Sequence, residues 1–425
     1  MAAAETAAGL AAFPGRGAGT DAERRAARWL AHQIRRGRRE AHLETFWCRP
    51  NWALAHAWHC LLAVVGSLLM VSHARVGGAL VLVSLLSVLA DGLAGRSLGR
   101  RLTPERASQN VVSPAPAGGA GSGPPLPDPQ VRLIITANLD AGRTGIAYRD
   151  LVRTPAARLR RLAAGGALTP GWLGWLAIEL LWLIGVAVLR MSGVGGTTPG
   201  ILQLVPTAAL VVEVAILLEL SGAPFGPAAG DNASGVGVAL ALVRALDAAP
   251  PRNLGVELVL QGAGDGTMTG LRRHLRRRRR ELRPQRTVVL GIGPCGAGRP
   301  CWWLSDGSLI PLRYPGRLRE LARHVAAGAG LSAEPHRGRG ITPALPARAQ
   351  GLPALAIGGI DRRGLAPRSH QPGDLPDALD SAAMDVVLHF ALLLVDEIDA
   401  AVAPVTGRSG ASQLASARSA GLMAP

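Results

Sequence analysis

Two long apolar blocks interrupt an otherwise mixed sequence. The first covers residues 52–94 and breaks at residues 72–75, and the second covers residues 172–220 and breaks at residues 190–200. Each half is long enough to cross a bilayer, which takes roughly 20 residues. We therefore expect four transmembrane helices in two hairpins, with burial of the same helices in a soluble core as the alternative. Residues 1–22 lack the apolar stretch of a signal peptide.

Basic residues are distributed unevenly around the two blocks. All 46 Lys and Arg positions hold arginine. The short connections inside the hairpins carry one each, Arg75 and Arg190, whereas the segments that flank the blocks carry many more. By the positive-inside rule, this asymmetry places both termini and all long segments in the cytoplasm of a multi-pass cell-membrane protein. The basic residues 22–39 and 272–280 are then expected to meet anionic lipid headgroups.

The net charge of +17 raises the question whether the chain binds nucleic acid. The arginines gather around the apolar blocks, and the chain has neither aromatic interleaving nor a recognisable nucleic-acid module. We therefore expect no nucleic-acid partner. The four cysteines, Cys48, Cys60, Cys295 and Cys301, fit neither a zinc knuckle nor a disulfide framework. Free thiols in a reducing compartment are expected.

Outside the apolar blocks, short apolar runs alternate with helix-like segments. This alternation predicts an α/β fold with a mainly parallel mixed sheet that has helices on both faces. The expected strands are residues 110–112, 131–137, 256–261, 288–292 and 354–357, and the expected helices are residues 236–246, 271–282, 318–327 and 382–402. The predicted organisation is a basic helical segment (1–51), the first hairpin (52–94), part of the α/β domain (95–171), the second hairpin (172–220), the rest of that domain (221–402) and a disordered tail (403–425).

The run Gly230-Asp231-Asn232-Ala233-Ser234-Gly235 stands immediately before the helix expected at residues 236–246. A carboxylate at a turn of small residues can approach a metal ion closely, because the backbone is not shielded by bulky side chains. Asp and Asn also open helices as ordinary N-caps, without any metal. The motif alone therefore leaves a metal ligand and an N-cap as alternatives.

Four motifs in this order resemble a known family. They are Gln109-Asn110-Val111-Val112, then Thr136-Ala137-Asn138-Leu139-Asp140, then the Asp231 motif with Gly264-Asp265, and finally Ser369-His370-Gln371-Pro372-Gly373-Asp374. The arrangement is similar to that of the co-catalytic di-zinc aminopeptidase superfamily, which includes bacterial leucyl aminopeptidase, glutamate carboxypeptidase and transferrin receptor. The resemblance covers residues 23–399 without the hairpins. It implies a zinc-exopeptidase-like fold.

The resemblance implies roles for four residues. Asp231 matches the aspartate that bridges both zinc ions, and His370 matches the last histidine ligand. Asp265 matches the acidic ligand that shares a zinc ion with that histidine. Asp140 matches the aspartate that orients the first histidine ligand.

Three positions depart from the family pattern. Asn138 stands where the family has its first histidine ligand, Gly264 where it has its general-base glutamate, and Gly293 near its other aspartate ligand. The matching residues Asp231 and Asp265, with His370, all belong to one zinc ion, so at most one metal site is expected. Glycine cannot take a proton from metal-bound water, and loss of a general base lowers a rate on the order of 10² to 10⁴-fold.

These matches and departures imply a membrane protein with a peptidase-like domain, without peptidase activity and with a binding or scaffolding role. A peptide or protein partner is implied alongside membrane lipid. One alternative is an active one-metal hydrolase of small peptides or amides. Another is a structural or transporter-like protein; a transporter requires Glu179 and Glu213 to face one another inside a water-lined bundle.

The second hairpin is inserted between Asp140 and Asp231, two residues that should both border the site. We therefore expect the site to lie close to the membrane surface. His56 and His59 stand at the start of an apolar span, and an interfacial position is expected for both. Trp302 and Trp303 are expected to serve in packing or at an interface, with the lining of a substrate pocket as the alternative.

Overall fold

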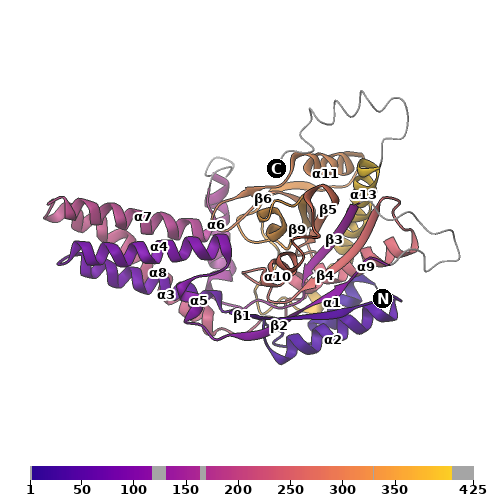
Figure 1. Ribbon diagram of the computed structural model, residues 1–425, viewed down its shortest axis with the longest axis horizontal. Coiled ribbons are helices and arrows are strands. Elements are labelled where there is room, and N and C mark those ends of the chain that lie inside the picture. The colour runs from indigo at the N-terminus through magenta and orange to yellow at the C-terminus, as the bar shows by residue number, and fades with distance from the viewer. Residues whose placement is uncertain (1, 117–130, 163–168, 329, 404–425) are drawn as a thin grey trace, which may run out of the picture.

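The computed structural model describes residues 2–116, 131–162, 169–328 and 330–403. An α/β body carries a bundle of four long helices that projects from one side (Figure 1). Most of the segment predicted to be a disordered tail lies outside the described residues.

The projecting bundle consists of the four helices expected from the apolar blocks. They are α3 (Trp52–Met70), α4 (Ala74–Ala94), α7 (Trp172–Met191) and α8 (Thr197–Gly222). All four are long and apolar enough to cross a membrane.

The two hairpins form one bundle, because they share a single apolar cluster. Leu85 of α4, Leu180 of α7 and Leu210 of α8 are all buried in it. Other large apolar side chains point outward along the same helices; the side chain of Leu204 is 67% exposed. An outward apolar surface of this extent suits contact with lipid rather than with water.

The body is built on a sheet of nine strands. Their order is β1-β2-β4-β3-β5-β9-β6-β7, with β8 paired to β6. The strands are β1 (His42–Cys48), β2 (Arg106–Ser113), β3 (Val131–Asn138), β4 (Leu254–Gln261), β5 (Thr287–Ile292), β6 (Arg299–Asp306), β7 (Leu312–Arg313), β8 (Glu334–Arg337) and β9 (Ala354–Ile360).

The sheet is mixed, and the prediction of a mainly parallel sheet is wrong. Only β3, β4, β5 and β9 form a continuous parallel centre. The strands β1, β2, β6 and β7 add antiparallel pairings at the two sides. The sequence prediction found the central strands because they are continuous apolar runs. It missed β1, which contains polar residues, β6, which contains polar residues and a proline, and the short strands β7 and β8.

Helices cover both faces of the parallel centre. The helix α9 (Ser234–Ala248) connects β3 to β4, and α10 (Thr269–Arg277) connects β4 to β5 on the opposite side of β3. Right-handed crossovers that run in opposite directions place their helices on opposite faces. The remaining helices are α1 (Ala3–Ala11), α2 (Asp21–Arg36), α5 (Leu98–Arg101), α6 (Asp150–Leu162), α11 (Gly316–Gly328), α12 (Leu345–Ala349) and α13 (Ser381–Val402).

The first 51 residues belong to the body. They supply α1, α2 and the edge strand β1, and Leu10, Leu30 and Ile34 are buried in the main core. Thr20 caps α2 by accepting a hydrogen bond from the backbone N–H of Glu23. The apolar face of α2 packs into the core, and contact of its basic residues with anionic lipid stays a prediction.

A buried polar network joins the bundle to the body. His56 Nε2 lies 3.0 Å from Asp91 Oδ2, and the guanidinium of Arg100 contacts both carboxylate oxygens of Asp91. His59 Nε2 lies 2.8 Å from Ser87 Oγ. Both rings are buried among the helices, and their position at a membrane interface stays a prediction. Asp91 thus has two basic partners, His56 and Arg100.

Candidate functional site

The ends of two adjacent parallel strands begin the site. Asn138 at the end of β3 pairs with Gln261 at the end of β4. Asp140 and Asp265 follow these two strands, so the sheet brings them to the same edge. Asp231 belongs to a short π-helical turn, η3 (Ala229–Ala233), directly before α9.

The chain brings Asp231, Asp265 and His370 together at this edge. His370 lies in the loop between β9 and α13. Its Nε2 atom is 3.3 Å from Asp265 Oδ1 and 3.6 Å from Asp231 Oδ2. The hydroxyl of Ser369 donates a hydrogen bond to Asp231 Oδ2 at 3.0 Å. The side chain of Asp231 does not cap α9, so the N-cap alternative is wrong for this residue.

The ring of His370 is held on two sides. Its Nδ1 atom lies 3.0 Å from the carbonyl oxygen of Arg143, which can only accept, so Nδ1 carries a proton and Nε2 faces the carboxylates. Tyr148 stacks on the ring with centroids 4.1 Å apart. A Cβ atom at Gly142 would lie 2.1 Å from His370 Cε1. Only glycine permits this close approach of the loop.

Two further carboxylates hold the loops that carry the acidic residues. Asp140 accepts hydrogen bonds from the backbone N–H groups of Gly264 at 2.8 Å and Asp265 at 3.1 Å. Asp374 accepts from the N–H groups of Gly230 at 2.8 Å and Asp231 at 3.0 Å. Both loops are therefore fixed by charge-assisted hydrogen bonds.

Arg16 braces the floor of the site from the N-terminal segment. Its guanidinium is fully buried and donates to the carbonyl oxygens of Leu139, Pro227 and Ala228. Burial lowers its pKa to about 10, against the opposing effect of the surrounding aspartates. A single cation thus ties the loop after β3 to the turn that carries Asp231.

The site holds more acid than base. Burial and then Asp265 raise the pKa of Asp140, and burial and then Asp231 raise the pKa of Asp374 to about 6. Burial acts to lower the pKa of His370, but Asp265 and Asp231 outweigh it and raise the pKa. Burial also raises the pKa of Asp265, against the opposing effect of His370. A cation placed here would relieve the repulsion among the carboxylates.

Unusual backbone conformations flank the acidic residues. His370 has φ 58°, Ala228 has φ 48° and Ala263 has φ 45°. Residues with a side chain seldom adopt this left-handed region, and such positions gather at functional sites. The loops here are held in place by their hydrogen bonds and not by local preference.

The positions that depart from the family pattern also lie at this edge. A Cβ atom at Gly264 would be 2.5 Å from Asn138 Oδ1 and 3.0 Å from Asp140 Oδ1. The amide of Asn138 therefore fills the space into which a side chain at position 264 would extend. Asn138 Oδ1 is buried, with no hydrogen-bond partner among the described residues. Gly293 follows β5, and its N–H donates to the carbonyl oxygen of Ile357.

The donors do not form a ready metal centre. Among the described residues, no group of three or more His, Cys, Asp and Glu side chains is arranged to hold a metal ion. His370 Nε2 instead contacts the two carboxylates directly. Two carboxylates and one imidazole are nevertheless a donor set of the type that zinc takes. Because His370 Nε2 now contacts both carboxylates, they would have to turn away from the ring to make room for the ion.

The site adjoins the base of the helical bundle. A cavity of about 170 Å³ beside Asp265 is lined by Trp52, the first residue of α3, and by Leu220 of α8. The indole N–H of Trp52 donates to the carboxylate of Asp265. The insertion of the second hairpin predicted this proximity. The contact made by Trp52 adds that the first hairpin also touches the site.

Several residues of the site were not foreseen from the sequence. Arg16, Trp52 and Tyr148 reach it from segments distant in sequence, and nothing in their local pattern indicated it. Asp374 could have been found, because it belongs to the motif that contains His370. Trp302 and Trp303 pack in the core as expected.

Solved structures of known function share this fold. A zinc aminopeptidase from Bacillus subtilis superposes with a TM-score of 0.53 at 14% sequence identity, over 93% of this chain and 94% of that one. A glutaminyl cyclase from Bacteroides thetaiotaomicron, solved with N-acetylhistamine, gives a TM-score of 0.53 at 12% identity over 93% and 96% of the two chains. A glutaminyl cyclase from Porphyromonas gingivalis gives 0.51 at 13% identity over 93% and 97%. The chain therefore has a zinc-exopeptidase-like fold. No protein-family model and no curated protein sequence matches it.

Proposed function

We propose that this chain is an integral membrane protein whose zinc-exopeptidase-like domain binds a ligand and does not hydrolyse peptides. The observation that carries the proposal is the contact between Asn138 and Gly264. A general base at position 264 would need the space that the Asn138 amide occupies, 2.5 Å from the ideal Cβ position. Asn138 and Gly264 thus stand at the positions of the family's first histidine and catalytic glutamate, and the amide of Asn138 fits there because position 264 has no side chain.

Two further carboxylates beside the site, Asp140 and Asp374, are already engaged by hydrogen bonds. Asp140 is raised in pKa by burial, which would suit proton transfer, but its two oxygens accept the N–H groups of Gly264 and Asp265. Asp374 is occupied in the same way by Gly230 and Asp231. Both carboxylates therefore serve to hold the loops in place.

At most one zinc ion fits the proposed site. Asp231, Asp265 and His370 would hold it, and a bound zinc ion would supply a Lewis acid that polarises an oxygen of the ligand. The protonated Nδ1 of His370 leaves Nε2 as the donor. The second zinc ion of the family has lost its private ligands at Asn138 and Gly293.

Zinc content tests this assignment. We expect the protein, purified in detergent and dialysed against zinc, to retain about one ion per chain. The variants Asp231→Ala and His370→Ala should retain none above background, while Asp361→Ala, which removes a carboxylate in the loop after β9, should leave the content unchanged. Two ions per chain, or retention by both site variants, would contradict the assignment.

The bundle is proposed to cross the cell membrane with the α/β body in the cytoplasm. The support is the arginine asymmetry together with the length and apolar character of the four helices. A thiol introduced by Gly195→Cys lies in the α7–α8 connection, and one introduced by Arg323→Cys lies on the exposed face of α11. The native cysteines are buried and give little background.

An impermeant maleimide should label only the Gly195→Cys variant on intact cells. Labelling of both variants after lysis serves as the control. Labelling of Arg323→Cys on intact cells would reverse the orientation.

An active one-metal enzyme is the second candidate. The small cavity beside Asp265 and the similarity in fold to glutaminyl cyclases favour a small substrate in that case. The transporter-like alternative has less support. Glu213 does lie within electrostatic reach of Glu179, but the bundle centre is filled by apolar side chains such as Leu176, Leu180 and Leu183.

A further inference from the structure

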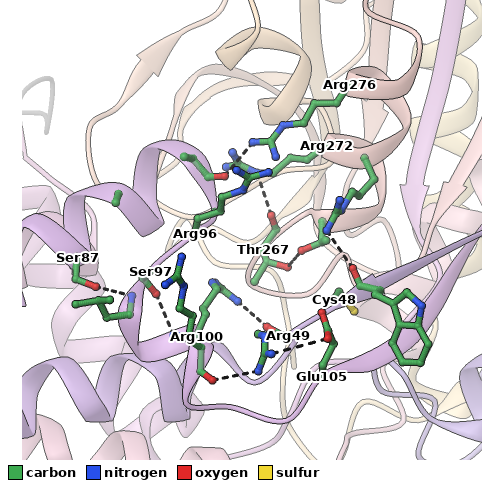
Figure 2. A pocket seen from close by; sticks show the side chains of 18 of the residues that line it. Cys48, Arg49, Ser87, Arg96, Ser97, Arg100, Glu105, Thr267, Arg272 and Arg276 are labelled. Atoms are coloured by element: carbon green, nitrogen blue, oxygen red, sulfur yellow. Dashed lines mark hydrogen bonds and ion pairs between the residues drawn. The ribbon is translucent and has the colours of Figure 1, made fainter.

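A second cavity, of about 600 Å³, lies where the end of α4 meets α10 (Figure 2). Seven arginines and a single glutamate line it, a charge imbalance that needs an explanation. We call it the arginine pocket. Its arginines come from the loop after β1, from the end of the first hairpin and from α10, so three segments distant in sequence converge on it.

Only two of the seven arginines have a carboxylate partner in the described part of the chain. Arg100 is held by Asp91, and Arg49 Nη2 lies 3.8 Å from Glu105 Oε2. Arg272 and Arg276 donate only to carbonyl oxygens, at Leu93 and Thr267 for the first and at Ala94 for the second. Acceptors of this kind satisfy N–H groups without neutralising their charge.

Arg96 has no hydrogen bond or ion pair with any described residue. Figure 2 shows its side chain together with those of Arg272 and Arg276 on one side of the pocket. Burial and then the charges of Arg96 and Arg273 lower the pKa of Arg276. Clustered guanidinium groups with no acid between them favour an anion, and their forked geometry suits a phosphate.

The pocket also has an apolar wall, which a free anion would not need. Val83 and Leu86 of α4 line it and are 41% and 57% exposed. They lie on a helix that the proposed function places across the membrane. Trp47 at the rim is 63% exposed, and tryptophan is enriched where membrane and water meet. The apolar wall thus lies on α4 itself, and the arginine cluster lies next to the end of that helix.

We propose that the arginine pocket binds an anionic phospholipid, with the headgroup phosphate at Arg96, Arg272 and Arg276 and an acyl chain along Val83 and Leu86. The inference rests on the membrane placement of α4 in the proposed function. A bound lipid of this kind connects α10 of the body to the end of α4. The ligand class follows from the combination of a phosphate-binding cluster and an apolar wall in one cavity.

The helix α10 is held rigidly, so this side of the arginine pocket is preorganised. The ring of His274 is buried between Glu44 of β1, 2.9 Å away, and Glu257 of β4, 3.3 Å away. Arg278 adds ion pairs to the same two glutamates. These contacts fix the helix, so Arg272 and Arg276 are presented in place before a ligand arrives.

The test measures lipid binding by the full chain purified in detergent. Dissociation constants for short-chain phosphatidylglycerol and phosphatidylcholine are compared by native mass spectrometry. We expect the wild type to prefer phosphatidylglycerol, and Arg96→Gln/Arg276→Gln to weaken that binding at least about tenfold, because each charge-assisted contact is strong. Arg96→Lys/Arg276→Lys, which keeps the charge, should lose much less.

The control variant Arg36→Gln/Arg323→Gln removes the same charge from α2 and α11, away from the bundle (Figure 1). It should bind phosphatidylglycerol within about twofold of the wild type, since surface charges at this distance are screened. Equal binding of both lipids, undiminished binding by Arg96→Gln/Arg276→Gln, or displacement of the lipid by inorganic phosphate at equal concentration would overturn the inference.

Membrane fractionation separates this inference from the proposed function. Protein that stays in carbonate-washed membranes while the arginine variants keep full lipid binding would refute the lipid site alone. Protein recovered without detergent in the soluble fraction would refute the membrane placement, and the lipid site with it.

Discussion

Two charged regions meet the same end of the helical bundle, and their charges are opposite. The site at the strand ends gathers Asp140, Asp231, Asp265 and Asp374 around His370. The arginine pocket gathers seven arginines and one glutamate. The local charge therefore favours a cation at the first region and an anion at the second.

The two regions differ in how far the protein satisfies its own charges. At the strand ends nearly every carboxylate already accepts backbone N–H groups or contacts His370, and the amide of Asn138 fills the space beside Gly264. In the arginine pocket, Arg96 has no partner among the described residues. The carboxylates at the strand ends are thus largely paired within the protein, whereas most arginines of the pocket have no carboxylate partner among the described residues.

The largest expected effect comes from removing the acid that underlies the arginine pocket. Asp91→Asn leaves Arg100 buried without its counter-ion and removes the partner of His56. Breaking a buried pair in this way costs about 3–5 kcal/mol. We expect a clear fall in the unfolding temperature of the purified protein. The control variant Arg96→Gln should unfold at the same temperature as the wild type. An unchanged unfolding temperature for Asp91→Asn would contradict the prediction, because it would show that the Asp91–Arg100 pair does not stabilise the protein.

A smaller effect is expected at the strand ends. Gly264→Ala places a methyl group 2.5 Å from Asn138 Oδ1, and overpacking of this kind costs about 1–3 kcal/mol. Asn138→Ala removes the obstructing amide together with its unpartnered oxygen. The double variant Asn138→Ala/Gly264→Ala should therefore recover most of the unfolding temperature. Equal losses in the single and the double variant would mean that Asn138 does not fill the position of the base.

The sequence predicted the parts of this molecule that depend on continuous apolar runs and on motifs. The bundle helices, the central strands and the neighbourhood of Asp231, Asp265 and His370 all belong to this class. It did not predict the mixed edges of the sheet, because polar residues in β1, and polar residues with a proline in β6, obscure the alternation that is typical of a strand.

The contacts that complete both regions could not be predicted from the sequence either. Arg16 reaches the site across more than 120 residues of sequence, and the pairing of Asp91 with Arg100 depends on the chain turning back after α4. Such contacts are set by the packing of whole elements. No local pattern of charge or hydropathy carries that information.

Peptide hydrolysis by the zinc-supplied protein tests the central claim most directly. The rate of cleavage of leucine p-nitroanilide should be no higher than that of Asp231→Ala measured beside it, because Gly264 offers no proton acceptor. Matched zinc concentrations and matched unfolding temperatures exclude a loss of folding. A wild-type rate at least about a hundredfold above that of Asp231→Ala would contradict the account and establish an active enzyme.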